Sequence, residues 1–241
     1  SPAGIETGLL RSGSLVLGGM TAFFTNYFLF PFDPEKVLRS AAKLACEDMG
    51  FFLEKVCRRV SDPTISEKEL ARLNREAIAS IRRYRTFLES FSIDPFKTVG
   101  MPGGPGLFYF ALVRLFESIV SLSNHTHFSD NRPEFSRLTK DFNRTAAQVS
   151  QEFKRFSRLR PQDMDPTGEQ PGWDHADEDI DRIRQSLLTL GGYQNGDAVR
   201  DKFQNAWAAV YGLKTVWADF RELKRLARCL APNPSSVRRS G

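Results

Sequence analysis

The sequence predicts an all-α fold, in which one N-terminal transmembrane helix precedes a cytoplasmic bundle of antiparallel helices. Apolar residues recur every three or four positions in several long segments, which is the spacing of a buried helical face. No stretch alternates between apolar and polar residues for long enough to indicate a strand. Residues 12–32 contain no charged side chain, and a helix needs about 20 predominantly apolar residues to cross a bilayer.

The composition indicates a folded protein with a small positive net charge. The 241 residues are 41% hydrophobic, which is enough apolar material for one substantial core. Lys and Arg number 34 against 29 Asp and Glu, and the net charge of +5 is modest for a dedicated nucleic-acid-binding protein. The net charge alone does not decide between these partners, but together with the uncharged segment at residues 12–32 it leads us to expect membrane lipid as a partner and no nucleic acid. Three cysteines in a chain of this length also argue against a disulfide scaffold, because one would remain unpaired.

The N-terminal part, residues 1–32, consists of the expected transmembrane helix and a short flank. Every fourth residue along one side of the uncharged segment is small or polar, namely Ser14, Gly18, Ala22 and Asn26. Small residues at this spacing let two helices approach closely in a membrane, and asparagine can hydrogen-bond across the contact. We expect these residues to contact other transmembrane helices, in the same protein or in a homo-oligomer. The alternative is a buried core helix of a soluble bundle, where small residues also permit close packing.

The charge on either side of the uncharged segment predicts its orientation. Only Arg11 precedes it, whereas six basic residues follow it closely: Lys36, Arg39, Lys43, Lys55, Arg58 and Arg59. Positive charge near a transmembrane helix stays on the cytoplasmic side. We therefore expect the chain to enter the cytoplasm after Phe32, with the helix in the inner cell membrane.

A helical hairpin opens the expected bundle, which covers residues 33–160. The first helix begins at residues 33–35, where an Asp cap, a Pro and a Glu follow one another, and it runs to about Val60. The sequence Ser-Glu-Lys-Glu at 66–69 forms a capping box for the second helix, which extends to Phe91. The short connection predicts that the two helices are antiparallel.

Two further helices complete this bundle. A loop rich in proline and glycine, residues 94–106, leads into a helix at about 107–123. The next helix begins at residues 131–133, where Asn-Arg-Pro provides a start signal, and it ends before Pro161. We expect its inward face to be formed by Phe135, Leu138, Phe142, Val149, Phe153 and Phe156.

An acidic linker, residues 161–181, separates the bundle from a C-terminal helical hairpin, residues 182–241, that packs on it. The linker holds eight acidic residues and no Lys or Arg, and it runs into the first turn of a fifth helix. The last helix has the most regular apolar stripe of the chain, formed by Val199, Phe203, Ala206, Val210, Leu213, Trp217, Phe220, Leu223 and Leu230. We expect this stripe to be buried against the helix that spans Leu70 to Phe91.

The sequence offers weak signals for metal binding, and we expect neither metal nor cofactor. His125, His127 and Asp130 have the right chemistry for zinc, but a polar turn explains them equally well. A calcium-loop template is matched in part by Asp163, Asp165, Thr167, Gly168, Glu169 and Asp174. Two prolines interrupt that loop, and its twelfth ligand is Asp instead of the longer Glu that binds in a bidentate manner.

The cysteines give no sign of catalysis. Cys46 and Cys57 lie about 16 Å apart along one helix, too far for a disulfide, and neither has a histidine nearby in the sequence. The sequence thus predicts no enzyme.

The stretch from Arg11 to Pro34 resembles the end of the first membrane block in the fusaric acid resistance and aromatic acid exporter family. The shared features are an arginine, the spaced Gly18 and Gly19, Ala22, an aromatic-rich half, and then Pro-Phe-Asp-Pro at 31–34. In that family the last helix of the block leads through a similar proline and aspartate into a cytoplasmic helical domain. The resemblance covers roughly residues 10–125, and arginine-rich helices flank a proline-containing loop in this chain too.

The resemblance implies that the chain is part of a membrane efflux transporter, with a cytoplasmic helical domain that supports assembly or gating. Family members carry several transmembrane helices before this point and usually a second membrane block after it, so the chain would need those helices to form a transport pathway. The alternative function is that of a soluble or membrane-peripheral helical adaptor, which binds a partner protein and buries the N-terminal segment in its own core.

Overall fold

The computed structural model describes residues 12–21, 34–62, 64–91, 104–128, 132–158, 174–190 and 197–229. All regular secondary structure within these ranges is helical, which confirms the all-α class. The chain divides into two compact units, residues 1–37 and residues 38–241. Residues 12–21 form a helix in the first unit, and the second unit is a helical bundle.

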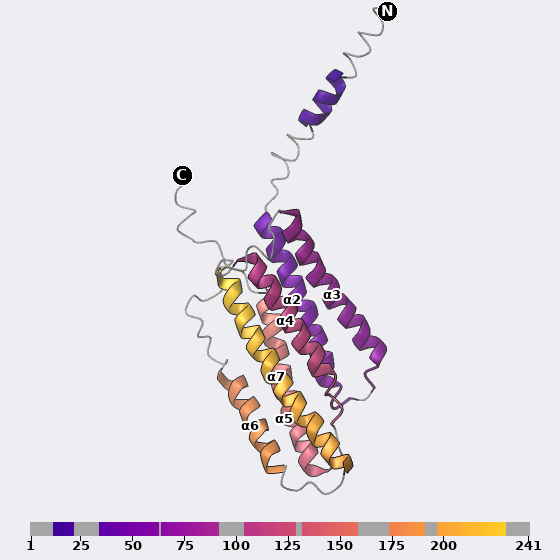
Figure 1. The fold of residues 1–241 in the computed structure, drawn as a ribbon, viewed down its shortest axis with the longest axis vertical. Coiled ribbons are helices and arrows are strands. Elements are labelled where there is room, and N and C mark those ends of the chain that lie inside the picture. The colour runs from indigo at the N-terminus through magenta and orange to yellow at the C-terminus, as the bar shows by residue number, and fades with distance from the viewer. Residues whose placement is uncertain are drawn as a thin grey trace, which may run out of the picture. The chain divides into compact units, whose positions relative to one another are not determined.

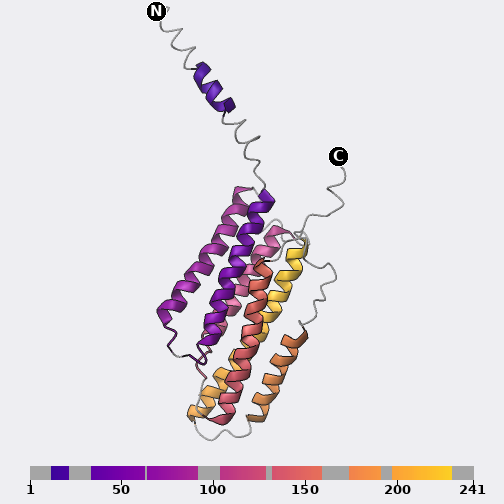
Figure 2. The same cartoon turned by 180° about the vertical axis from the view of Figure 1, so that it is seen from behind.

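Among the described residues, the helices that build the bundle are α2 (Pro34–Arg58), α3 (Glu67–Ser90), α4 (Pro105–Ser123), α5 (Pro133–Arg158), α6 (Asp174–Leu190) and α7 (Asp197–Cys229). In Figure 1, α4 and α7 face the viewer, and α3 and α6 lie at opposite edges of the bundle. Figure 2 shows the reverse side, where α2 and α5 lie in front. The bundle therefore has two layers, α4 with α7 and α2 with α5, and one further helix at each edge.

Local start signals fix where several helices begin. Pro34, Pro105 and Pro133 are each the first residue of a helix, a position where proline loses no hydrogen bond and has the right φ angle. At α3, the backbone N–H of Glu69 donates to the side-chain oxygen of Ser66 over 3.2 Å, which confirms the predicted cap. The predicted starts of α2, α3, α4 and α5 therefore agree with the structure to within a few residues.

Large aromatic residues fill the core between α5 and α7. The rings of Phe153 and Phe220 stack with centroids 3.9 Å apart. Phe156 meets the Phe220 ring edge-on at 5.6 Å, and Trp217 lies 5.9 Å from it. All four side chains are buried, so the apolar stripe of α7 is a core element, as its spacing predicts.

The helices that contact α7 differ from those expected. Its main neighbours are α4, α6 and α5, whereas α3 contacts α4. The expected docking of the last helix on the segment from Leu70 to Phe91 is therefore wrong. A polar contact accompanies the packing of α7 on α4, because the buried carboxylate of Asp219 accepts hydrogen bonds from Ser118 at 2.6 Å and pairs with Arg114 at 2.8 Å.

Helix α6 begins inside the segment expected to be the acidic linker. Its first residue is Asp174, and acidic side chains in a first helical turn are stabilised by the positive end of the helix dipole. Ion pairs then fasten α6 to α7: Asp177 contacts Arg221 at 2.5 Å, and Asp181 contacts Lys214 at 2.9 Å. The hydrogen bond from Lys214 also holds the pKa of Asp181 below its usual range. Acidic residues that were expected in a solvated linker therefore form the first turns of a helix and pair with basic residues of α7.

Helix α2 lies close to both α5 and α3. The hydroxyl of Ser150 donates to the backbone carbonyl of Gly50 over 3.2 Å, and a Cβ placed on Gly50 would lie 3.2 Å from the Cβ of Phe153. Asp48 accepts a hydrogen bond from Ser80 of α3. The last turn of α2 lies beside the first turn of α3, where Lys55 pairs with Glu69, and a pocket lies next to this contact.

Candidate functional site

The first of the sequence-predicted site residues lie on an exposed helix. Ser14 and Gly18 are one turn apart within the helical residues 12–21, and Ala22 and Asn26 lie outside the described residues. The apolar side chains on this helix are at least half exposed, from 76% for Leu15 to 53% for Met20. A Cβ placed on Gly18 would meet no atom within 4 Å outside the helix's own backbone. Within the described part of its own unit, residues 1–37, no side chain covers the apolar surface of this helix.

Thr21 shows how this helix satisfies a polar side chain internally. Its hydroxyl donates to the backbone carbonyl of Leu17 over 2.7 Å. A threonine that bonds one turn back along its own helix needs no water for that donor, which suits an apolar environment.

Among the described residues, one helix is long and apolar enough to span a membrane, and it is α4, with 19 residues. A core helix of a soluble protein meets the same criterion. Leu112, Leu115, Ile119 and Leu122 of α4 are completely buried in the bundle. The apolar character of α4 is therefore compatible with membrane association but is also explained by its contacts with α7 and α3.

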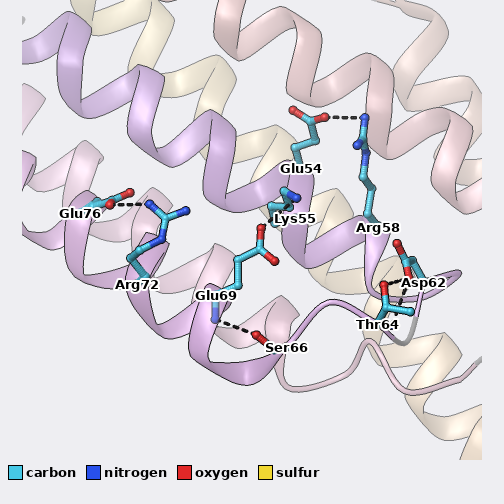
Figure 3. A network of polar contacts seen from close by, with 9 residues as sticks. All are labelled: Glu54, Lys55, Arg58, Asp62, Thr64, Ser66, Glu69, Arg72 and Glu76. Atoms are coloured by element: carbon cyan, nitrogen blue, oxygen red, sulfur yellow. Dashed lines mark hydrogen bonds and ion pairs between the residues drawn. The ribbon is translucent and has the colours of Figure 1, made fainter.

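Polar contacts order the turn between α2 and α3 (Figure 3). Asp62 accepts hydrogen bonds from the side chain of Thr64 at 2.5 Å and from its backbone N–H at 3.0 Å, and these bonds hold the pKa of Asp62 below its usual range. Lys55 of α2 pairs with Glu69 of α3 at 2.9 Å. The turn is thus held by bonds within it and by an ion pair across it.

A pocket of about 270 Å³ lies beside this turn, where α2 ends, α3 begins and α4 ends. Its lining residues are Phe52, Arg59, Glu67, Leu70, Ala71, Asn74, Ser123, Asn124 and His127. A guanidinium nitrogen of Arg59 lies 3.2 Å from a carboxylate oxygen of Glu67. The side-chain oxygen of Asn74 is buried and has no hydrogen-bond partner. The exposed lining of the pocket is therefore mostly polar, because Phe52 and Leu70 are almost completely buried and the Arg59 cation is paired with Glu67.

The sequence does not predict this pocket, although it contains one signal for it. Asn74 follows Leu70 by one helical turn and precedes Ala77 by three residues, and both of those are buried. A polar residue at the edge of a buried apolar stripe indicates either a hydrogen-bond partner or a cavity.

A second pocket, of about 240 Å³, lies between α2 and α5. Glu54 forms ion pairs there with Lys154 of α5 and, at 2.7 Å, with Arg58. Cys57 also lines this pocket, but burial raises the pKa of its thiol. Burial likewise raises the pKa of Cys46 to about 12. Neither thiol is ionised near neutral pH, so thiolate chemistry is not supported at these positions.

The metal-binding signals of the sequence gain no support from the geometry. Within the parts of the chain that the structure describes, no three His, Cys, Asp or Glu side chains lie together as a metal site would need. Thr126 is buried and donates to the carbonyl of Ser123 over 3.1 Å, whereas its neighbour His127 is exposed. Asp130 and all but the last position of the calcium-loop template, Asp174, lie outside the described residues.

Comparisons of this chain with models of protein families, with curated proteins and with solved structures give no match. The class of protein therefore rests on the fold and the site: an all-α protein whose described residues form a helix at residues 12–21 and a bundle of the helices α2 to α7.

Proposed function

We propose that this chain is part of a membrane efflux transporter similar to the fusaric acid and aromatic acid exporters. Residues 12–32 would cross the inner membrane, and the bundle would be a cytoplasmic domain that supports assembly or gating. The proposal assigns no catalytic residue and no cofactor. The observation that carries it is the helix at residues 12–21, which lies in an uncharged segment and whose apolar side chains are exposed.

Carbonate extraction of membranes from cells that express the chain tests this proposal. A protein with a spanning helix stays in the membrane pellet at high pH, because hydrophobic insertion does not depend on surface charge. We expect the full chain in the pellet. Release of the chain into the supernatant would contradict the proposal and would favour the adaptor function.

The small residues of the N-terminal helix give a second prediction. Gly18→Leu should weaken association between transmembrane helices without reducing insertion, because leucine is favourable in lipid but blocks close approach of two backbones. Val16→Leu is a matched control, since Val16 lies on the opposite side of the helix from Gly18. A transmembrane association assay should show a loss for Gly18→Leu alone. An equal signal from both variants would remove Gly18 from the contact.

One observation favours the adaptor function as a second candidate. Leu188 of α6 and Trp207 and Tyr211 of α7 are large apolar side chains with substantial exposure. The ion pairs between α6 and α7 place Leu188 near the level of Trp207 along the two antiparallel helices. Exposed aromatic residues grouped in this way are typical of contact sites between proteins.

A further inference from the structure

The two ends of the α2–α3 hairpin differ in charge. A short turn connects the two helices, so α2 begins and α3 ends at the same end of the bundle (Figure 1). Residues 38–46 and 81–90, which form this end of the hairpin, include a single acidic side chain, that of Glu89. They include five basic residues, which we call the basic end: Arg39, Lys43, Arg82, Arg83 and Arg85.

The opposite end of the hairpin is balanced in charge. Residues 54–62 and 66–72 contain five basic and four acidic side chains. Most of these side chains form ion pairs, and Lys55 pairs with Glu69 across the hairpin at 2.9 Å (Figure 3). At the basic end, by contrast, the one carboxylate of the hairpin cannot neutralise five cations.

The helix that packs on α3 does not supply the missing negative charge. This helix is α4, and its residues 105–113 carry no charged side chain. The three arginines of the basic end that lie on α3 are exposed, and its two members on α2 are partly exposed. Like charges grouped on a surface repel one another and destabilise the folded state. The basic end is therefore suited to an anionic partner.

The position of the basic end in the chain identifies that partner. Helix α2 begins at Pro34, directly after the uncharged segment 12–32. This inference rests on the proposed function, in which that segment crosses the membrane. Arg39 and Arg85 each lie about 8 Å from the outer end of their helix, at 1.5 Å per residue. Anionic lipids attract basic side chains over about one Debye length, which is about 8 Å at physiological ionic strength.

We propose that the basic end docks the bundle against an anionic lipid surface, such as one that contains phosphatidylglycerol. Its guanidinium groups donate hydrogen bonds to phosphate oxygens of the headgroups, a geometry that suits arginine. Its basic residues further from the helix ends reach the surface through their long, flexible side chains. This contact orients the bundle at the membrane, and a domain that supports assembly or gating needs such a fixed orientation.

Arg85 and Arg72 form a matched pair that tests this docking within one sample. Both are arginines of α3 that pair with a glutamate one turn later, Arg85 with Glu89 at 2.8 Å and Arg72 with Glu76 at 2.7 Å. Their side chains are 50% and 56% exposed, respectively. The two arginines therefore differ mainly in the end of the helix at which they lie.

Phenylglyoxal, an uncharged reagent that modifies arginine, measures the accessibility of both residues in the full chain reconstituted into vesicles. Mass spectrometry of peptides gives the rate of modification at each arginine. One set of vesicles contains phosphatidylcholine alone, and the other also contains about a quarter phosphatidylglycerol, which gives a negative surface potential. We expect Arg85 to react about threefold more slowly in the anionic vesicles, and Arg72 to react equally in both. High salt should remove the difference, because it screens the attraction.

Three outcomes separate this proposal from its alternatives. Equal reaction rates of Arg85 in the two sets of vesicles would overturn the docking. Carbonate extraction of the same vesicles reports independently on the spanning helix, because release of the chain would contradict the span whether or not Arg85 is protected. Protection of Arg85 by an RNA oligonucleotide in neutral vesicles, with no effect of phosphatidylglycerol, would overturn the proposal in favour of nucleic acid.

Removal of charge from the basic end should abolish the protection of Arg85. Each basic residue near an anionic surface changes the binding constant about fivefold, so Arg82→Gln combined with Arg83→Gln should weaken docking about 25-fold. Arg72→Gln combined with Arg75→Gln is the matched control, because it removes the same charge from exposed positions nearer the start of α3. The control variant should keep the protection of Arg85. Full protection of Arg85 in the variant of Arg82 and Arg83 would overturn the proposal.

Discussion

Phe220→Ala should destabilise the bundle by about 3–5 kcal/mol, the usual cost of truncating a large buried aromatic side chain. Phe220 is fully buried, and its ring contacts those of Phe153, Phe156 and Trp217. The substitution removes ring contacts to α5 and to Trp217 of α7 itself, and it leaves a cavity that stiff aromatic neighbours fill poorly. Urea unfolding of the full chain, followed by far-ultraviolet circular dichroism, measures the change.

Tyr211→Ala is the matched control for this prediction. Tyr211 is an aromatic residue of similar size on the same helix, but its side chain is 69% exposed. We expect a change within about 0.5 kcal/mol, as for most surface substitutions. If Phe220→Ala and Tyr211→Ala both unfold at the same urea concentration as the unchanged chain, then α7 is not part of the core of the bundle.

Gly212→Leu should be the second large effect, because Gly212 is where α7 approaches α4 most closely among the described glycines. A Cβ at this position would lie 3.2 Å from Cδ1, 3.4 Å from Cβ and 3.5 Å from Cα of Leu122. Leucine must place three more carbon atoms in this space, so α4 and α7 must separate. We expect a loss of about 1–3 kcal/mol in the free energy of unfolding, the usual cost of overpacking.

Gly212→Ala separates this steric effect from helix propensity. Alanine is favoured over glycine in a helix by about 0.8–1 kcal/mol, and it adds only the Cβ, whose nearest neighbour is the movable end of Leu122. The two effects oppose each other, so the net change should stay within about 1 kcal/mol. Ala218→Leu, on the exposed side of α7, should be neutral. A Gly212→Leu variant as stable as Ala218→Leu would contradict the close contact.

Start signals and apolar spacing made the helices predictable, because both act within a few residues. The serine cap of α3 lies where the sequence places it, and α4 begins at Pro105, two residues before the predicted start. Spacing also identifies the buried faces, since Trp217 and Phe220 lie on one stripe and are both buried. The acidic residues at the start of α6 did not predict where this helix begins, because they are typical both of a solvated linker and of a first helical turn.

The pocket depended on the tertiary structure, although Asn74 is visible as a polar residue beside an apolar stripe. Arg59 precedes the α2–α3 turn, Asn74 follows it, and Ser123 comes from the end of α4. These residues come together only when α2 and α3 form their hairpin and α4 packs against it. No local spacing in the sequence predicts this pocket, because the pocket results from contacts between residues far apart in the chain.

The sequence by itself determined an all-α chain, the starts of α2 to α5 to within a few residues, and most of the buried faces of α5 and α7, because these follow from local hydrogen bonding and from the helical repeat. Only the tertiary structure decided which faces meet. An apolar stripe is satisfied by any apolar partner, and the choice of α4, α5 and α6 for α7 depends on fit: the glycine at 212 against Leu122, the ring of Phe220 against Phe153, and the carboxylate of Asp219 against Ser118. Such complementarity of shape and hydrogen bonding exists only once the helices are side by side.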